Sequence, residues 1–178
     1  VYIGLGANLN QPVQQLQQAI EALQQLADSE LIAVSSLYGS KPMGPQDQPD
    51  YVNAVAALDT TLEAEALLDA LQQIEQLHGR QRKAERWGPR TLDLDILLFG
   101  DRLIAEPRLQ VPHYHLQARA FVLYPLAEIA PAELLLADGR RLVDLLAAHG
   151  KTLEQCQGEC ETETGRLIGA DIIVTGEI

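Results

Sequence analysis

The chain has 178 residues, a length typical of one globular domain with at most a short appendage. Apolar residues make up 47% of it and charged residues 21%, which excludes wholesale disorder and allows a core of ordinary size. Its 13 basic and 25 acidic residues leave a net charge of −12, which argues against a nucleic-acid or anionic-membrane binder. We expect a cytoplasmic protein, because no run of about 18 apolar residues occurs and the first ten residues contain no Lys or Arg.

Strands and helices alternate in the predicted first half of the chain. Residues 1–6 form an apolar strand signal, and Pro12 opens a helix whose apolar residues recur at spacings of three and four. The segments 31–38 and 51–58 are rich in strand-forming residues. Between them, prolines and glycines are so frequent in residues 41–50 that this stretch must be a loop.

The second half begins with a clear helix and a clear strand and then becomes fragmented. Residues 63–77 have the spacing of a second amphipathic helix, and residues 91–99 give the strongest strand signal in the sequence. Four prolines break the chain that follows into short pieces: Pro107, Pro112, Pro125 and Pro131. One more helix is expected at 142–146, between two glycines.

This order of elements favours an α+β fold, a ferredoxin-like α/β sandwich whose mostly antiparallel sheet has helices packed on it. We expect one domain over residues 1–150 and an acidic C-terminal tail over 151–178, whose role the sequence does not indicate. The tail contains Cys156 and Cys160, too few for a disulfide framework and expected to be free thiols. An apolar run at 172–174 is a candidate edge strand.

Two carboxylates stand on one face of the strand predicted at 91–99. Because successive side chains of a strand point to opposite faces, Asp93 and Asp95 project together, with their Cα atoms roughly 7 Å apart. From there their oxygens can converge on one cation, or on two cations about 4 Å apart. On its own this pattern is weak evidence for a metal site, since it often marks only the solvent-exposed face of a strand, so its meaning depends on its surroundings.

A cationic stretch leads directly into this acidic pair. Residues 80–90 contain five basic side chains against Glu85 alone, together with Trp87. An ordinary solvated loop would have the same composition. Next to the carboxylates, however, it suits a polyphosphate, because Mg²⁺ prefers carboxylate and phosphate oxygens and guanidinium groups neutralise the remaining charge. The sequence has no P-loop, and Gly4-x-Gly6 lacks the third glycine of a dinucleotide fingerprint.

Aromatic side chains, only 4% of the residues, gather near polar ones. Tyr51 and Asn53 share a face of one predicted strand, and Phe121 lies close to Arg119. This arrangement suits a flat, hydrogen-bonding ring as a second ligand. The alternative, that Tyr51 and Phe121 are core residues, stays open.

Residues 86–97, RWGPRTLDLDIL, are similar position by position to the signature of the 6-hydroxymethyl-7,8-dihydropterin pyrophosphokinases of folate biosynthesis. Further blocks resemble the same family: GANL at 6–9, GPQDQPDYVN at 44–53, and VPHY at 111–114 with Arg119 and Phe121. The resemblance implies ATP-dependent transfer of diphosphate to the hydroxymethyl group of the dihydropterin, giving AMP and the pterin diphosphate. Its cofactor would be two Mg²⁺ ions, with ATP as co-substrate.

The resemblance also implies roles for residues at matching positions. Asp93 and Asp95 would bind the metal, and Asp95 would act in catalysis with Arg80 and Arg90. The expected ATP contacts are Leu68, Gln72, Glu75, Arg80, Arg82, Trp87, Arg90, Ile96, Arg108, His113, Tyr114 and Arg119. The expected pterin contacts are Pro42, Met43, Gly44, Tyr51, Asn53, Trp87, Asp95 and Phe121. Two loops, 40–50 and 80–90, are expected to close over both substrates.

Three residues depart from the family pattern: Ser40, Met43 and Gln110. We expect them to alter affinity and not chemistry. Two other functions compete with the pyrophosphokinase, a phosphate- or RNA-binding module without turnover and a nucleotidyltransferase that uses the same acidic pair. The partners expected are ATP and a dihydropterin, with no nucleic acid and no membrane, and the chain is expected to be a monomer.

Overall fold

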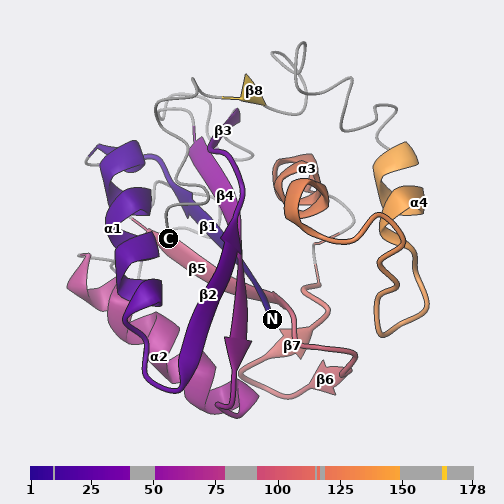
Figure 1. Cartoon of the computed structure of the whole chain (residues 1–178), viewed down its shortest axis with the longest axis horizontal. Helices are drawn as coiled ribbons and strands as arrows, with labels where there is room; N and C mark the ends of the chain where they lie inside the picture. Colours follow the sequence, from indigo (N-terminus) through magenta and orange to yellow (C-terminus); the bar gives the residue numbers. More distant parts are fainter. Residues whose placement is uncertain are drawn as a thin grey trace.

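A mostly antiparallel sheet with helices on both of its faces forms the body of the molecule, as the sequence predicted (Figure 1). The computed structural model describes residues 1–9, 11–40, 51–78, 92–114, 116, 119–148 and 166–167. None of the helices within these ranges has the length and apolar character needed to cross a membrane.

The centre of the sheet is β1 (Tyr2–Ala7), which lies between β4 (Tyr51–Thr60) and β5 (Asp93–Leu98). Both neighbours run antiparallel to it. These strands confirm the predictions at 1–6, 51–58 and 91–99 to within two residues. All three direct alternate side chains to opposite faces, so each strand contributes to two different layers of the molecule.

The single strand predicted at 31–38 is wrong, because the structure divides it into β2 (Ser29–Val34) and β3 (Tyr38–Ser40). Both pair with β4. At the break, the Ser35 hydroxyl accepts a hydrogen bond from the backbone N–H of Val55 at 2.9 Å. A side chain thus replaces the backbone carbonyl of a regular ladder, and the strand is interrupted there.

On its outer side β3 pairs with β8 (Arg166–Leu167), two residues of the segment expected to be a tail. The proposed boundary at 150 stays a prediction. Cys156, Cys160 and the run at 172–174 lie outside the described residues.

One face of the sheet is covered by α1 (Pro12–Gln24) and α2 (Ala64–Leu77), which Figure 1 shows side by side. Both helices were predicted, and both bury one apolar stripe against the sheet. Leu16, Leu23 and Leu71 are fully buried there. The proline predicted to open the first helix occupies its first turn, where no intrahelical N–H is lost.

The opposite face is covered by α3 (Ala120–Ile129), with α4 (Leu142–Ala147) packed outside it. The prediction that Pro125 ends a short piece is wrong, because this proline lies inside α3. Packing on both sides stabilises α3 enough to compensate for the backbone hydrogen bond that the proline removes. The prediction of a helix at 142–146 is confirmed by α4.

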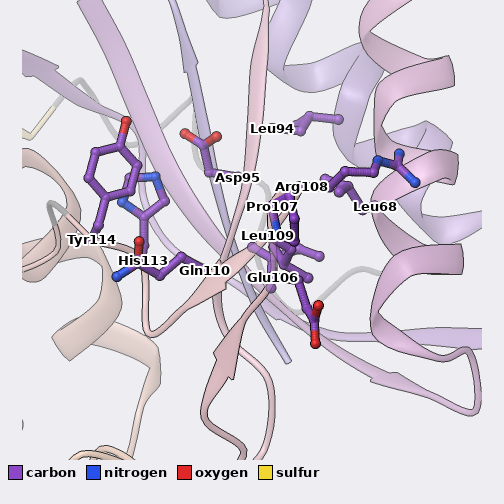
Figure 2. Close-up of a pocket in the computed structure, with 11 residues that line it drawn as sticks. Leu68, Leu94, Asp95, Glu106, Pro107, Arg108, Leu109, Gln110, His113 and Tyr114 are labelled. Carbon is purple, nitrogen blue, oxygen red and sulfur yellow. The ribbon is translucent and has the colours of Figure 1, made fainter.

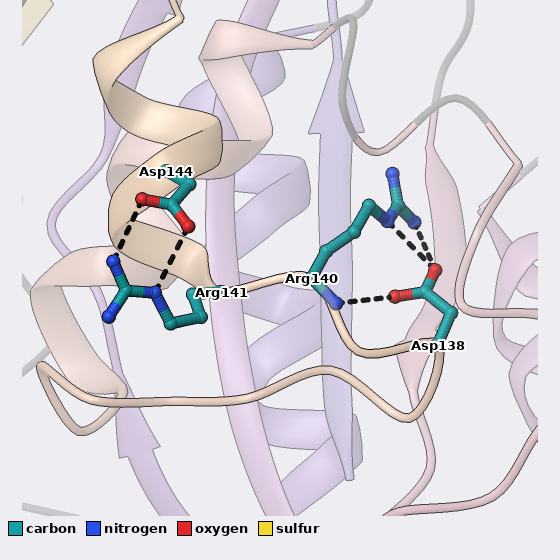
Figure 3. Close-up of polar contacts among 4 residues, drawn as sticks. All are labelled: Asp138, Arg140, Arg141 and Asp144. Carbon is teal, nitrogen blue, oxygen red and sulfur yellow. Dashed lines mark hydrogen bonds and ion pairs between the residues drawn. The ribbon is translucent and has the colours of Figure 1, made fainter.

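Ion pairs surround the start of α4 at the molecular surface (Figure 3). Arg141 Nε donates to Asp144 Oδ2 at 3.0 Å, and Arg140 Nε donates to Asp138 Oδ2 at 2.8 Å. The hydrogen bonds from these arginines lower the pKa of both carboxyl groups below their usual value. Since the groups are close to solvent, such pairs contribute little to stability.

Tyr38 connects β3 to α3. Its hydroxyl donates to Glu128 Oε1 at 2.8 Å, and the other oxygen of Glu128 accepts the backbone N–H of Ser36 at 2.5 Å. Burial, and then the hydrogen bond to this carboxylate, raise the pKa of Tyr38. One acidic side chain therefore fixes α3 over the interrupted edge of the sheet.

Candidate active site

Asp93 and Asp95 lie on the face of β5 turned away from α1 and α2. Both are partly exposed, and the Asp95 side chain retains 41% of its accessible surface. Leu94 and Ile96 alternate with them and are buried in the core beneath α2. The predicted separation of acidic and apolar faces is confirmed, and the acidic face is open to a ligand.

Asn53 joins this face from the other side of β1. In the two strand registers, Gly6 pairs with Asn53 of β4 and with Asp93 of β5. Directly paired residues of antiparallel strands point to the same face, so the amide and the carboxylate flank the glycine. Asn53 is 4% exposed and Tyr51, two residues earlier, is partly exposed. The structure therefore places two of the predicted pterin contacts, Tyr51 and Asn53, on the same side of the sheet as Asp93 and Asp95.

Glu75, on α2, holds the strand that carries the acidic pair. Its carboxylate is 3% exposed, and Oε2 accepts the backbone N–H of Leu94 at 3.0 Å. In the described sheet β5 is an edge strand beside β1, so this carboxylate occupies the position of a further strand. The structure shows this carboxylate buried against β5, and its predicted contact with ATP stays a prediction.

A cavity of about 300 Å³ lies beside Asp95, between β5, α2 and the hairpin of β6 (Ile104–Ala105) and β7 (Gln110–Val111) (Figure 2). It brings together six of the predicted site residues: Leu68, Asp95, Ile96, Arg108, His113 and Tyr114. The hairpin residues Glu106, Pro107 and Leu109 also line the cavity and were not predicted from the sequence. Two-residue strands carry no periodic signal by which they could be found.

Aromatic and cationic groups lie at the two ends of this cavity in Figure 2. The rings of His113 and Tyr114 stack with their centroids 4.9 Å apart. At the other end, Arg108 Nη2 donates to Asp69 Oδ1 of α2 at 2.5 Å and to Gln72 Oε1 at 3.5 Å. The hydrogen bond to Asp69 raises the pKa of Arg108. Gln72, a predicted ATP contact, is thus hydrogen-bonded to an arginine that lines the cavity.

Arg119 connects the acidic pair to the predicted pterin side. Its Nη1 is 4.0 Å from Asp95 Oδ2, and its guanidinium carbon is 5.8 Å from the centre of the Phe121 ring. The side chain retains only 15% of its accessible surface. Because Arg119 is the residue that precedes α3, the second helical layer positions a cation beside the carboxylates.

The remaining predicted site residues lie outside the described residues: Pro42, Met43, Gly44, Arg80, Arg82, Trp87 and Arg90. Within the described ranges, no group of three or more His, Cys, Asp and Glu side chains is gathered for metal binding. A pair of carboxylates nevertheless fits Mg²⁺, which keeps several waters and binds through one or two carboxylates plus substrate phosphates. The site therefore has the donor set of a metal-assisted phosphoryl-transfer enzyme.

Comparisons with known proteins identify the family. The model for 7,8-dihydro-6-hydroxymethylpterin-pyrophosphokinase (HPPK) matches residues 2–131. The chain is 62% identical over 148 residues to 2-amino-4-hydroxy-6-hydroxymethyldihydropteridine pyrophosphokinase of Pseudomonas aeruginosa, covering 83% of this chain and 90% of that one. It is 53% identical over 145 residues to the Haemophilus influenzae protein of the same name, covering 82% and 89%. The chain belongs to the HPPK family.

Solved structures agree on the fold. The chain is similar to Plasmodium falciparum HPPK-DHPS wild type with SDX-DHP, with a TM-score of 0.63 and 15% identity, over 83% of this chain and 43% of that one. The same wild-type protein with pteroate gives a TM-score of 0.65 at 13% identity, over 83% and 42%. The chain thus spans less than half of these longer proteins. The predicted ferredoxin-like sandwich is confirmed.

The family establishes the reaction. The enzyme transfers diphosphate from ATP to the hydroxymethyl group of 6-hydroxymethyl-7,8-dihydropterin in folate biosynthesis. ATP and the pterin are its substrates. This confirms the predicted enzyme class over the binding module and the nucleotidyltransferase.

Proposed function

We propose that the transfer takes place on the face of the sheet that carries Asp93 and Asp95, with the nucleotide in the adjoining cavity and the pterin on the Asn53 side. One observation supports this most directly. Asp95 both lines the cavity and belongs to the acidic pair, whose other member lies across Gly6 from Asn53. The transferred phosphorus would lie between the nucleotide in the cavity and the pterin on the Asn53 side.

Asp93 and Asp95 are the proposed ligands of two Mg²⁺ ions, which supply neutralisation of the triphosphate charge. The donor chemistry supports this, because both groups are carboxylates on one strand face and are partly open to solvent. Arg119 is proposed to balance the negative charge that the carboxylates and phosphates concentrate here. Arg80, Arg82 and Arg90 stay proposed phosphate contacts.

In the proposed reaction the pterin hydroxymethyl oxygen forms a bond to Pβ of ATP. The bond from Pβ to the oxygen that bridges it to Pα breaks, and AMP leaves with that oxygen. Asp95 orients the attacking hydroxyl, whose proton passes to solvent. Most of the catalysis then comes from positioning and charge neutralisation, and no covalent nucleophile is needed.

Replacing Asp95, which lines the cavity and belongs to the acidic pair, tests this assignment. Asp95→Asn should lower AMP formation from ATP and the pterin by about a thousandfold or more, since phosphoryl transfer depends on charge neutralisation. Isothermal titration calorimetry should show Mg²⁺-assisted nucleotide binding lost, with the thermal unfolding temperature preserved. Asp101→Asn, at an exposed position after β5, is the matched control. Full activity of Asp95→Asn would contradict the assignment.

We also propose that the chain acts as a cytoplasmic monomer that binds neither nucleic acid nor membranes. The net charge of −12 supports this, since it repels polyanions and other copies of the chain. Light scattering after size exclusion would test the oligomeric state, and a dimer at micromolar concentration would contradict it.

A further inference from the structure

Gly6 lies at the centre of the site and has no assigned role. It is partly exposed although β1 is a central strand, whereas Leu5 and Ala7 on either side are buried beneath the helices. Its two cross-strand partners, Asn53 and Asp93, point to the same face. Gly6 therefore lies between an amide and a carboxylate and places no side chain between them.

The Asn53 amide oxygen lies against Gly6. A Cβ atom built on Gly6 would lie 3.0 Å from Asn53 Oδ1, and its next neighbour would be the backbone oxygen of Val52 at 4.0 Å. A carbon at 3.0 Å is closer than an ordinary van der Waals contact. Asn53 is 4% exposed, so its amide has little room to move aside. Any side chain at position 6 would therefore displace the Asn53 oxygen.

Gly4 provides an internal comparison on the same strand and the same face. It is buried, and the three atoms nearest to a Cβ built there all belong to the Leu97 side chain, the closest at 3.3 Å. Leu97 is part of the core beneath α3. A methyl group at position 4 would thus press on a flexible apolar side chain, and one at position 6 on a polar group of the site.

We infer that Gly6 is a positioning residue that determines specificity for the pterin. The missing Cβ atom leaves the space beside the Asn53 amide oxygen and lets a flat heterocycle approach the strand backbone between Asn53 and Asp93. A larger residue would displace the amide and keep the heterocycle farther from the strand backbone. The inference rests on the proposal that Asn53 contacts the pterin.

Comparing Gly6→Ala with Gly4→Ala tests the inference, because both add one methyl group to the same face of one strand. Gly6→Ala should raise KM for the pterin by about tenfold, the effect of one well-placed hydrogen bond. The calorimetric Kd for an ATP analogue with Mg²⁺ should be unchanged. In Gly4→Ala the added methyl group meets Leu97, although Gly4 pairs with Asp95, so the unfolding temperature should fall and the pterin KM should rise less than in Gly6→Ala. An unchanged pterin KM in Gly6→Ala would overturn the inference.

The variant Asn53→Ala separates the possible causes of failure. If Asn53→Ala raises the pterin KM while Gly6→Ala does not, the role of Gly6 is refuted and that of Asn53 stands. If neither variant raises the pterin KM, the proposal that Asn53 contacts the pterin is refuted, and the inference about Gly6 is refuted with it.

Should Gly6→Ala fold poorly, the double variant with Asn53→Ala is decisive. Removing the crowded amide should restore much of the lost unfolding temperature, a non-additive effect expected only where two residues touch. Additive losses would count against the inference.

Discussion

The two faces of the sheet differ in what the same strands offer them. Toward α1 and α2, alternate residues of β1, β4 and β5 are aliphatic and form a continuous apolar core. Toward α3, the same strands present Gly6, Asn53 and the two aspartates, together with apolar residues that pack in the core beneath α3. The alternation of side chains along each strand therefore provides one face for packing and the other for chemistry. Packing on the α1 and α2 face holds in place the strands that carry the site residues.

This comparison predicts that equal core defects have unequal consequences for activity. Leu23 of α1 and Leu123 of α3 are both fully buried, on opposite faces. Each substitution by alanine should lower the free energy of unfolding by about 2–5 kcal/mol, measured by urea denaturation. Below the unfolding transition, only Leu123→Ala should raise the pterin KM, because α3 follows Arg119 and contains Phe121.

The exposed Leu77 supplies the control, since its replacement by alanine should change stability by less than about 0.5 kcal/mol. Equal changes in the pterin KM for the two buried variants would show that the faces are not functionally distinct.

A smaller effect is expected where the apolar face supports the acidic one directly. Glu75→Leu removes the acceptor of the buried Leu94 N–H and should cost about 1–3 kcal/mol of unfolding free energy. It should also weaken Mg²⁺-assisted nucleotide binding in calorimetry, since β5 loses its outer support between the two aspartates.

Glu75→Gln keeps an oxygen acceptor of nearly the same shape and is the matched control. It should retain most of the stability and of the nucleotide affinity. If Gln is as damaging as Leu, the negative charge and not the hydrogen bond to β5 is what matters.

Features set by short-range patterns were predictable from the sequence. The alternation around Asp93 and Asp95 and the apolar stripes of α1 and α2 follow from local periodicity, and the structure confirms them. The acidic pair could therefore be placed correctly on a strand face before any tertiary contact was known. Its chemistry came from the neighbouring motifs and the family they resemble.

Features set by contacts distant in sequence were not predictable. Buried residues lie on most sides of α3, between the sheet and α4, so it shows no amphipathic stripe. Ser35 breaks a strand through Val55, 20 residues away, and Glu75 supports β5 through Leu94, 19 residues away. No local pattern encodes such pairings.

The smallest expected effect concerns the rim of the cavity, where Asp69 pairs with Arg108. Both side chains are about half exposed, so solvent screens the pair and it contributes little to stability. A carboxylate on this arginine competes with a phosphate for the same donors. Asp69→Asn should therefore lower the KM for ATP about two- to threefold at low salt, and by less at 0.5 M salt, where screening weakens the pair.

Glu21→Gln, on the exposed side of α1, removes the same charge far from the cavity and should leave the KM for ATP unchanged. A fall in KM in both variants would attribute the effect to net charge alone. A rise in KM for Asp69→Asn would instead mean that Asp69 holds Arg108 in the position from which it binds the nucleotide. Helix α2, which packs on the apolar face of the sheet, would then contribute to substrate binding as well as to packing.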